Sequence, residues 1–510
     1  MNHWVIAPIL LPLLIGSVQL LLGTARPGLQ RGLGLTGTAA LIPLATVLLV
    51  QTGDGIPEAY AVGEWSAPFG IALVADSLSA SLLLLTACVA LPCLLYATTS
   101  DDSEGPRFHA LFQFQLLGVN GAFLTGDLFN LFVFFEILLI ASFALLLHGS
   151  GLQRSRAAIH LVALNLAGSA IFLIAIGALY GAAGTLNLAH LARIVPQLNG
   201  NQAALAHTSA LLLLIVFGLK AAVFPLGFWL AQSYSAAAAS VAALFSLMTK
   251  VGAYSIMRVY PLVFDADAGE LAEIARPWLL PAALVTLAMG TIGTLAASTL
   301  RSLVAWLLVI SIGIVLIGVG LFSAAGLAAA IFYTVHSTLV TAALFLIADL
   351  IGRQRAGTGD RLDSSAPVHQ PALLGTFFVI GAVAVTGLPP FAGFLGKILI
   401  LRAALPHSTN AWLWAAVLLS SLAILLAGAR AGSIVFWKVG DAVAAELRAP
   451  RRGVLAVLAL LALNILLMLF GSHATDYASE VARQLMTPGA YEAAVLGDDL
   501  VSDVRSGDSP

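Results

Sequence analysis

The chain contains about fourteen apolar runs, each roughly as long as the 20 residues that a helix needs to cross the hydrocarbon core of a membrane. Of its 510 residues, 60% are hydrophobic and only 9% are charged. So little polar surface excludes a soluble globular protein, and the near balance of 23 basic and 25 acidic residues argues against a nucleic-acid partner. We predict an all-α polytopic protein that lies in the lipid bilayer. The predicted spans cover residues 4–23, 29–50, 71–96, 108–125, 128–148, 157–180, 207–229, 236–260, 278–299, 302–322, 325–349, 371–404, 411–437 and 452–470.

Lysine and arginine residues gather in alternate loops. The loop after the first span and every second loop after it are basic, whereas the intervening loops contain only Arg193, Arg258, Arg276 and Arg402. Because basic loops face the cytoplasm, both termini are predicted on the non-cytoplasmic side. The first run lacks a preceding basic segment and a small-residue cleavage pattern, so we expect a retained helix and not a cleaved signal peptide.

Two of the runs combine a lysine with helix-breaking prolines. The segment GLKAAVFPLGFW contains Lys220 and Pro225, and the segment GLPPFAGFLGK contains Pro389, Pro390 and Lys397. Proline removes a backbone donor and clashes with the preceding turn, so helices 7 and 12 are predicted to be broken. Broken spans in matching positions of two halves indicate an ion path near the bilayer midplane. The alternative is that a long membrane protein simply collects such kinks.

The two broken helices divide the chain into repeats. Helices 4–8 and helices 9–13 form two groups of five, and an odd number of spans per group forces opposite orientations in the membrane. We therefore predict an inverted repeat. The predicted parts are the first three helices in residues 1–107, the two repeats in residues 108–260 and 261–437, and a loop, helix 14 and a polar tail in residues 438–510.

Five ionisable side chains lie near the middle of predicted spans. A charged side chain at the centre of a membrane helix costs about 2.5–3.5 kcal/mol, so its retention indicates a wet or paired interior with a function. Lysine, glutamate and histidine release and accept protons, which arginine does not do in practice. We therefore predict a proton relay. Its members are Glu136 in helix 5, Lys220 in helix 7, Lys250 in helix 8, His336 in helix 11 and Lys397 in helix 12.

Simpler explanations stay open for most of these residues. Glu136 and Lys220 would also fit a static salt bridge between helices. Lys250 lies about ten residues from the end of its helix and would also fit a snorkelling role. His336 would also fit a neutral core histidine bonded to a neighbouring helix. Lys397, beside a break, is the hardest to explain in this way.

Other polar residues are weaker signals. Asp76 and Asp127 open predicted helices, where a carboxylate caps the N-terminus. Asp349 and Arg430 lie near span ends and are expected at the interface, so the replacement of Asp349 by asparagine should have little effect. Residues 187–195 are expected to form a short surface helix, and the tail after Gly471 one amphipathic helix and a disordered end. Candidates for lining a polar path, or for bonding between helices, are Asn130, His160, Asn165, Ser169 and Thr249.

Motifs of cofactor sites are not found in the sequence. It contains no phosphate-binding loop, no dinucleotide fingerprint and no cysteine set for an iron–sulfur cluster. Cys88 and Cys93 lie in one apolar run and are expected to be core residues. We predict no metal and no cofactor, so transport must be driven by an ion gradient or by partner subunits.

Four segments together resemble the antiporter-like membrane subunits shared by respiratory complex I, membrane-bound hydrogenases and the Mrp multisubunit cation/proton antiporters. They are GDLFNLFVFFEILLIAS, GLKAAVFPLGFWL, ALFSLMTKVGAYSIMRVY and TGLPPFAGFLGK. The first is most similar to the D branch of the Mrp antiporters. The resemblance covers nearly the whole chain, from about Asp76 to helix 14.

The resemblance implies a fourteen-helix fold with two inverted repeats around a central hydrophilic axis, in the inner membrane of a bacterium. Glu136, Lys220, Lys250, His336 and Lys397 match the family's helix 5 glutamate, helix 7 lysine, helix 8 lysine, helix 11 histidine and helix 12 lysine. In that family the glutamate–lysine pair gates proton movement, and the other groups carry protons laterally and to one exit. The implied partners are other membrane subunits, protons, and Na⁺ or K⁺.

We therefore expect a subunit of a secondary transporter, not an enzyme, that exchanges Na⁺ or K⁺ for protons. The alternative is a proton-pumping membrane subunit of a redox enzyme, either complex I or a hydrogenase. A stand-alone solute carrier is a third possibility, which the lysine relay disfavours.

Two positions depart from the family's pattern. The family commonly has a lysine in helix 11 shortly after the histidine, and Thr341 stands there in this chain. The departure puts in doubt how protons cross between the halves; a water molecule or the Thr341 hydroxyl would have to bridge the gap. The usual proline after the FWL of helix 7 is Ala231, which is expected to alter only a loop.

Overall fold

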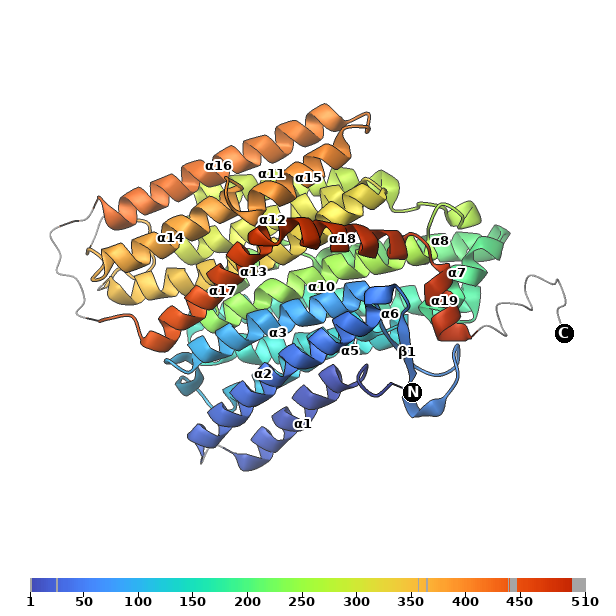
Figure 1. The fold of residues 1–510 in the computed structure, drawn as a ribbon, viewed down its shortest axis with the longest axis horizontal. Coiled ribbons are helices and arrows are strands. Elements are labelled where there is room, and N and C mark those ends of the chain that lie inside the picture. Colours follow the sequence, from blue (N-terminus) through green and yellow to red (C-terminus); the bar gives the residue numbers. More distant parts are fainter. Residues whose placement is uncertain are drawn as a thin grey trace.

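The computed structural model is a bundle of long helices (Figure 1). Within the residues that it describes, eleven helices are long and apolar enough to cross a membrane. The chain is thus a predominantly helical, multi-pass membrane protein, as predicted. The described residues are 2–23, 26–355, 357–363, 366–438, 440 and 447–497.

Every predicted span overlaps a helix or a pair of helices. The helices are α1 (Ala7–Leu22), α2 (Pro27–Gln51), α3 (Ser77–Ala97), α4 (Phe108–Leu124), α5 (Leu128–Leu147), α6 (Leu152–Ala183), α7 (Leu188–Ile194), α8 (Gly200–Lys220), α9 (Phe228–Ala236), α10 (Ala239–Val263), α11 (Arg276–Ala296), α12 (Leu300–Gly320), α13 (Ala324–Gln354), α14 (Pro371–Thr386), α15 (Ala392–Ala404), α16 (Asn410–Phe436), α17 (Arg451–Leu469), α18 (Gly471–Leu485) and α19 (Gly489–Leu496), and the strands are β1 (Glu58–Ala61) and β2 (Ala72–Ala75).

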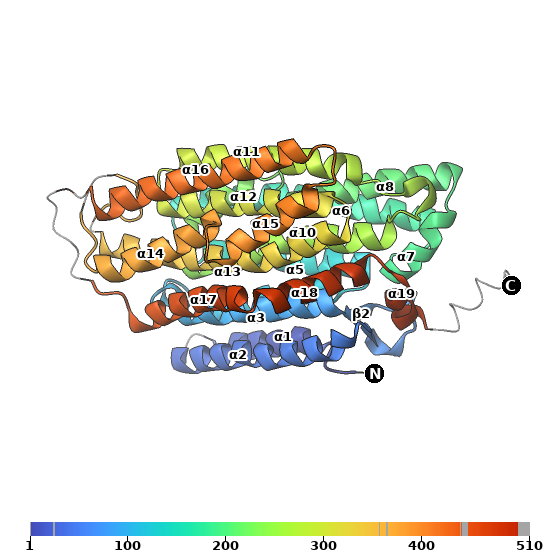
Figure 2. The same cartoon turned by 45° about the horizontal axis from the view of Figure 1, so that its top comes forward.

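The helices pack in layers (Figure 2). Helices α1 and α2 form an outer layer at one side, and α11 and α16 lie at the opposite side. Between them lie α10, α12 and α13, whose spans are almost entirely buried. Helices that are apolar on all sides are stable only when they are surrounded, either by other helices or by lipid. Helix α13 contacts α10, α12, α15 and α17, so it connects the earlier and the later helices of the chain.

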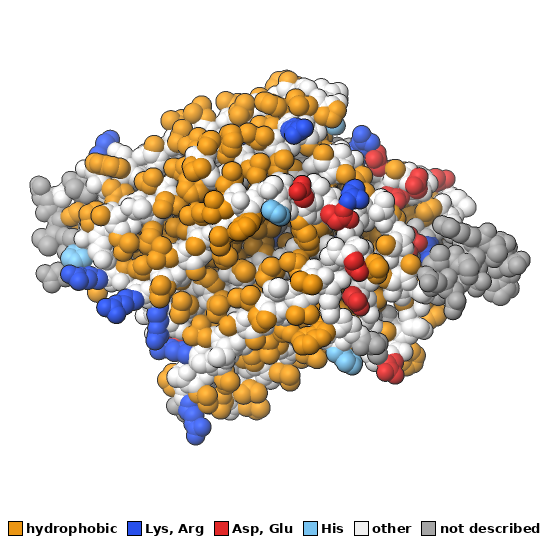
Figure 3. Space-filling model, in the orientation of Figure 1, with side chains coloured by type: hydrophobic (Ala, Val, Ile, Leu, Met, Phe, Trp, Pro, Cys, Tyr) orange, Lys and Arg blue, Asp and Glu red, His pale blue; other side chains and the backbone are white. Residues whose placement is uncertain are grey.

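The molecular surface agrees with a membrane environment. In the face shown in Figure 3, apolar side chains cover the left and central part, several basic side chains lie at the left edge, and the acidic ones lie in the right half. The N-terminal end of the chain and α19 lie together at the right (Figure 1).

The chain leaves helical geometry at both proline-containing breaks. Helix α8 ends at Lys220 and α9 begins at Phe228, while α14 ends at Thr386 and α15 begins at Ala392. Partners from other elements satisfy the freed backbone groups of the first break. The backbone N–H of Phe224 donates to the Thr286 hydroxyl of α11 (3.0 Å), and the indole N–H of Trp229 donates to the carbonyl of Leu219 (3.2 Å). An unwound segment inside a membrane protein is stable only when it is satisfied in this way.

Three expectations need correction. Residues 72–75 were predicted as the start of a helix, but they form β2, which pairs antiparallel with β1 so that Glu58 lies opposite Ala75. The helix begins only after Asp76, whose carboxylate accepts the N–H of Ser79. Hydropathy does not separate this apolar strand from the apolar helix that follows it. The chain is therefore not purely α-helical.

The tail holds two helices, α18 and α19, where one was predicted. The end that was predicted to be disordered, residues 498–510, lies outside the described residues. Helix α7 confirms the short helix predicted near residues 187–195. Arg258, which the charge pattern assigned to a loop, lies in α10 and is buried.

Candidate functional site

Glu136 lies in α5 and Lys220 lies at the end of α8, and α6 packs against both helices. The Ser169 hydroxyl of α6 donates to Glu136 Oε1. The Lys220 ammonium lies over the ring of Phe135, 5.3 Å from its centroid. Within the described residues, neither Glu136 nor Lys220 forms an ion pair within 4.0 Å, although the charge of Glu136 acts on Lys220. The structure thus brings the two residues together but does not form the direct salt bridge of the simpler alternative.

A small cavity adjoins Lys220. Its lining includes Asn165 of α6, Phe135 of α5 and Trp229 of α9, and its volume is about 20 Å³. That is room for about one water molecule. Asn165 donates its amide N–H to the carbonyl of Leu161 (2.9 Å). The ammonium and this amide together form a polar lining within an otherwise apolar bundle.

Lys250 lies in the centre of the bundle, with 1% of its surface exposed. Its ammonium donates to the Ser311 hydroxyl of α12 (2.8 Å), which donates in turn to the carbonyl of Leu308 (2.7 Å). A lysine that snorkels places its amine at the membrane surface. The Lys250 amine instead points inward, so the snorkelling alternative is wrong.

Lys397 occupies the break between α14 and α15. Its ammonium donates to the carbonyl oxygen of Thr386 (2.7 Å) and to the Ser421 hydroxyl of α16 (2.9 Å), with the carbonyl of Val385 at 3.4 Å. Carbonyls at the C-terminal end of a helix carry partial negative charge and favour a cation. The broken helix therefore supplies the oxygen ligands for a lysine that is only 5% exposed.

His336 is completely buried in α13. The amide nitrogen of Asn464, in α17, lies 3.0 Å from His336 Nδ1 and also donates to the His336 carbonyl oxygen (3.2 Å). The ring of Tyr333 is 5.6 Å away between centroids. This geometry matches the alternative of a histidine bonded to a neighbouring helix, and it leaves the second ring nitrogen for other chemistry.

Three of the weaker candidates are satisfied by nearby residues of the chain. Thr341 donates to the carbonyl of Ser337 (2.6 Å), Thr249 donates to that of Ser246 (3.3 Å), and Asn130 donates to the Thr125 hydroxyl (3.0 Å). These hydrogen bonds do not join them to the charged residues. His160 is exposed on α6. Asp127 caps α5 by accepting the Asn130 N–H, as predicted.

Sequence reasoning missed most of the partners of the ionisable groups. Ser311, Ser421 and Asn464 were not singled out, and Ser169 was named without its partner. Isolated serines and asparagines are common in membrane helices, where they often bond to their own backbone. The signal that would have found them is a polar residue at the same predicted depth as a lysine on a neighbouring span.

Asp349 is not interfacial, contrary to the sequence-based expectation. It is 6% exposed and accepts hydrogen bonds from Tyr96 (2.6 Å), Arg301 (2.5 Å) and Arg353 (2.5 Å). Arg353 also pairs with Asp101 (3.1 Å). Arg301 comes from α12, and Arg353 comes from the same helix as Asp349. Their charges compensate the buried carboxylate, although it lies near a helix end. The cluster joins one end of α3, α12 and α13.

A second buried ion pair lies near the start of α3. Arg258 donates to both carboxylate oxygens of Asp76 (2.5 and 2.7 Å) and lies between the rings of Tyr254 and Tyr491, 5.4 and 5.5 Å from their centroids. Burial alone would raise the pKa of Asp76, but the charge and hydrogen bonds of Arg258 outweigh burial and hold it below its ordinary value of 3.8. The pair attaches the C-terminal helix α19 to α10 and α3.

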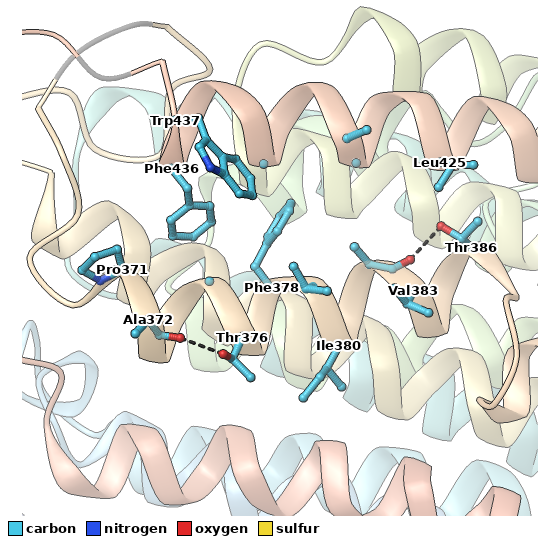
Figure 4. Close-up of a pocket in the computed structure, with 16 residues that line it drawn as sticks. Pro371, Ala372, Thr376, Phe378, Ile380, Val383, Thr386, Leu425, Phe436 and Trp437 are labelled. Carbon is cyan, nitrogen blue, oxygen red and sulfur yellow. Dashed lines mark hydrogen bonds between the residues drawn. The ribbon is translucent and has the colours of Figure 1, made fainter.

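An apolar groove of about 770 Å³ lies between α14 and α16 (Figure 4). Phe378, Phe436 and Trp437 line it, and two threonines reach it. Thr376 and Thr386 both donate to carbonyls of their own helix (2.7 Å each). The groove therefore offers few free polar atoms to an ion, and none of the five candidate ionisable residues lines it.

Comparison with known proteins shows that this fold is the fold of the antiporter-like membrane subunits. A family profile described as "NADH:quinone oxidoreductase/Mrp antiporter, TM" matches residues 125–424. This chain belongs to that family.

Within the family, this chain is similar to D subunits over nearly its whole length. It is 37% identical to a protein of Rhizobium meliloti that is named as the D subunit of a probable K⁺/H⁺ antiporter, over 97% of this chain and 98% of that protein. It is 36% identical to the D subunit of a Na⁺/H⁺ antiporter of Bacillus subtilis, over 97% of this chain and 100% of that protein. A chain of the solved Mrp complex of a Dietzia species superposes with a TM-score of 0.88 at 28% identity, over 98% of this chain and 100% of that chain.

Proposed function

We propose that the chain is the D subunit of a multisubunit antiporter that exchanges Na⁺ or K⁺ for protons, and that it contributes the proton path. The observation that carries this proposal is its full-length similarity to proteins named as D subunits of such antiporters. The residues in the proposed path exchange protons, so the proposal assigns the proton to this chain and the cation to neighbouring subunits.

The proposed path consists of the five buried ionisable residues. Glu136 and Lys220 form its gate: the charge of Glu136 acts on Lys220 although no direct ion pair joins them, and a movement that brings them into contact would favour the charged form of the lysine. Lys250 lies next in the central helices, and His336 and Lys397 follow near the second break. Ser169, Ser311, Ser421 and Asn464 hold these groups with hydrogen bonds. Each group releases or accepts a proton in turn.

The proposed topology has fourteen spans in two inverted repeats. To the eleven candidate spans this topology adds three more, namely α1, α4 and the broken pair α14–α15. The first repeat would contain α4, α5, α6, α8–α9 and α10, and the second α11, α12, α13, α14–α15 and α16. The matching positions of the two lysine-bearing breaks, each in the fourth helix of its repeat, support this division. In this topology the protein lies in a bacterial inner membrane with both termini on the non-cytoplasmic side.

The test uses membrane vesicles that contain the assembled complex. An acid-inside pH gradient is imposed, and Na⁺ or K⁺ is added while an internal dye reports the pH. We expect the cation to dissipate the gradient. A gradient that responds only to quinone or hydrogenase substrates would instead place the chain in a redox-driven pump.

A second arm tests the need for partners. The purified chain in liposomes should not exchange cations for protons, because the cation path is assigned to other subunits. Exchange by the chain alone would contradict the multisubunit assignment.

A further inference from the structure

The bond between Asn464 and His336 determines which ring nitrogen carries the proton. The amide nitrogen of Asn464 lies 3.0 Å from His336 Nδ1 and 3.2 Å from the His336 carbonyl oxygen. A carbonyl oxygen only accepts, so the atom that faces both must be the NH₂ group of the amide. His336 Nδ1 is therefore an acceptor, and the neutral ring carries its proton on Nε2.

The protonated nitrogen points at the second helix break. Within the described residues, His336 Nε2 has no hydrogen-bond partner, although the residue is fully buried. A Cβ atom placed on Gly393 would lie 2.6 Å from Nε2 and 2.2 Å from the carbonyl oxygen of Ala384. Only glycine leaves this space open. The Nε2–H group and the end of α14 therefore face the same point.

Ala384 is the first of the three residues that end α14, and the carbonyls of the other two contact Lys397. The next two carbonyls along the chain, those of Val385 and Thr386, accept hydrogen bonds from the Lys397 ammonium. His336 Nε2 and Lys397 Nζ thus both lie near the C-terminal end of α14. The charged groups that act on His336 are Lys397 from α15 and Lys250 from α10.

We propose that Asn464 is a positioning residue that holds His336 in the Nε2–H tautomer and so directs its proton exchange toward Lys397. The inference rests on the proposed function. With its NH₂ group on Nδ1, Asn464 blocks protonation of that nitrogen. Protonation requires the amide to rotate and offer Oδ1, which has no partner among the described residues.

The proton balance of one step follows from this geometry. A proton binds to His336 Nδ1 as Asn464 rotates, and the ring becomes an imidazolium. The Nε2–H bond then breaks, and its proton passes through water to the neutral amine of Lys397. The ring is left neutral with its proton on Nδ1. Movement of that proton from Nδ1 to Nε2 through water, as Asn464 rotates back, restores the starting tautomer, so that the net result is one proton delivered to Lys397.

The test is the ¹⁵N spectrum of histidine-labelled complex in membranes. The His336→Gln variant removes one pair of signals and so assigns them. In the unsubstituted protein we expect a protonated Nε2 and an unprotonated Nδ1. In Asn464→Leu the second tautomer should appear, and in Asn464→Asp Nδ1 should become protonated. A protonated Nδ1 in the unsubstituted protein, or unchanged signals in Asn464→Leu, would overturn the inference.

A matched variant separates this effect from a general loss of packing. Asn120 of α4 is buried and donates to the Pro8 carbonyl (2.8 Å), far from His336 in the chain. Asn120→Leu should leave the His336 signals unchanged, whereas Asn464→Leu should also slow cation–proton exchange about fivefold, as expected for the loss of one hydrogen bond. Normal exchange by His336→Gln would refute the proposed path, yet the spectra would still decide the role of Asn464.

Discussion

At the scale of single residues, the two buried lysines Lys250 and Lys397 are held by neutral oxygens, unlike Asp76 and Asp349, which are held by arginines. Lys250 and Lys397 each donate to a serine hydroxyl, and Lys397 also donates to backbone carbonyls. These oxygens accept hydrogen bonds from the charged ammonium of a lysine. They also accept hydrogen bonds from its neutral amine, because the amine still has N–H groups. A direct carboxylate partner would favour only the charged form. Neutral partners therefore suit a group that must change its protonation state.

The serine next to Lys397 gives a sharp test. Ser421→Ala removes the hydroxyl that lies 2.9 Å from the Lys397 ammonium, and hydrogen bonds to charged groups are among the stronger ones, so cation–proton exchange should fall about tenfold. The control is Ser420→Ala. Ser420 is the preceding residue and is buried. Both serine hydroxyls donate to the carbonyl of Val417, that of Ser420 at 2.9 Å and that of Ser421 at 2.8 Å. Equal rates for the two variants would contradict a role for Ser421.

Asp349 should matter for stability, in contrast to the expectation from sequence. Asp349→Asn leaves Arg301 and Arg353 without their shared carboxylate, and breaking a buried pair costs about 3–5 kcal/mol. We expect a clearly lower melting temperature of the solubilised complex. Glu104→Gln is the control, since its pair with Arg154 is more exposed and should contribute less than about 1 kcal/mol. Equal melting temperatures for the unsubstituted protein and Asp349→Asn would show that the cluster is not structural.

The pair of Asp76 and Arg258 predicts a pH dependence. Because the folded pKa of Asp76 lies below its ordinary value of 3.8, its stabilisation is complete above that value and is lost as the pH falls through the folded pKa. Asp76→Asn should therefore melt earlier than the unsubstituted protein at pH 7, and the difference should shrink only in strong acid. Asp127→Asn, at a helix cap without an arginine, should differ little at pH 7. A difference for Asp76→Asn that stays constant down to the lowest pH would contradict the charge-based explanation.

At the scale of elements, close helix contacts position the first break. Helix α10 passes directly beside the end of α8, since a Cβ atom on Gly252 would lie 2.3 Å from the backbone nitrogen of Ala221 and 2.7 Å from the carbonyl carbon of Lys220. Small residues allow such contact between membrane helices. Gly252 thus fixes where the Lys220 side chain starts.

Gly252→Ala should push α10 away from the break and displace Lys220. We expect cation–proton exchange to fall about tenfold or more, while the amount of chain in the membrane falls less, because displacement of about 1 Å is costly for function. Gly177→Ala is the matched control, since nothing lies within 4 Å of its added methyl group. The contact would be unimportant if both variants exchanged ions equally well.

The elements show what the sequence can and cannot predict. Hydropathy located the spans, and prolines located both breaks, because both signals are local. The hairpin of β1 and β2 was missed because β2 continues an apolar run. The bond between Tyr96 and Asp349 joins residues 253 positions apart, and no local pattern marks it. The same holds for Asn464, whose partner His336 lies 128 positions away.

At the scale of the whole molecule, three buried helices form the centre, and the lipid-facing helices surround them. Lys250 and His336 lie on two of these inner helices, α10 and α13, and Ser311 lies on the third, α12. In the sequence, Glu136 and Lys220 precede these three helices, and Lys397 follows them. The proposed lateral movement of protons requires proton-exchanging groups in both halves of the chain, and the five proposed residues come from both.

The most direct test of this account is cation-driven dissipation of a pH gradient in vesicles that carry the assembled complex with either Glu136→Gln or Lys220→Ala. Glu104→Gln serves as the control, and the amount of assembled complex is measured for each variant. We predict that both variants assemble normally and lose exchange completely, while the control exchanges at the rate of the unsubstituted protein. Exchange at that rate by either Glu136→Gln or Lys220→Ala would contradict the proposed proton path.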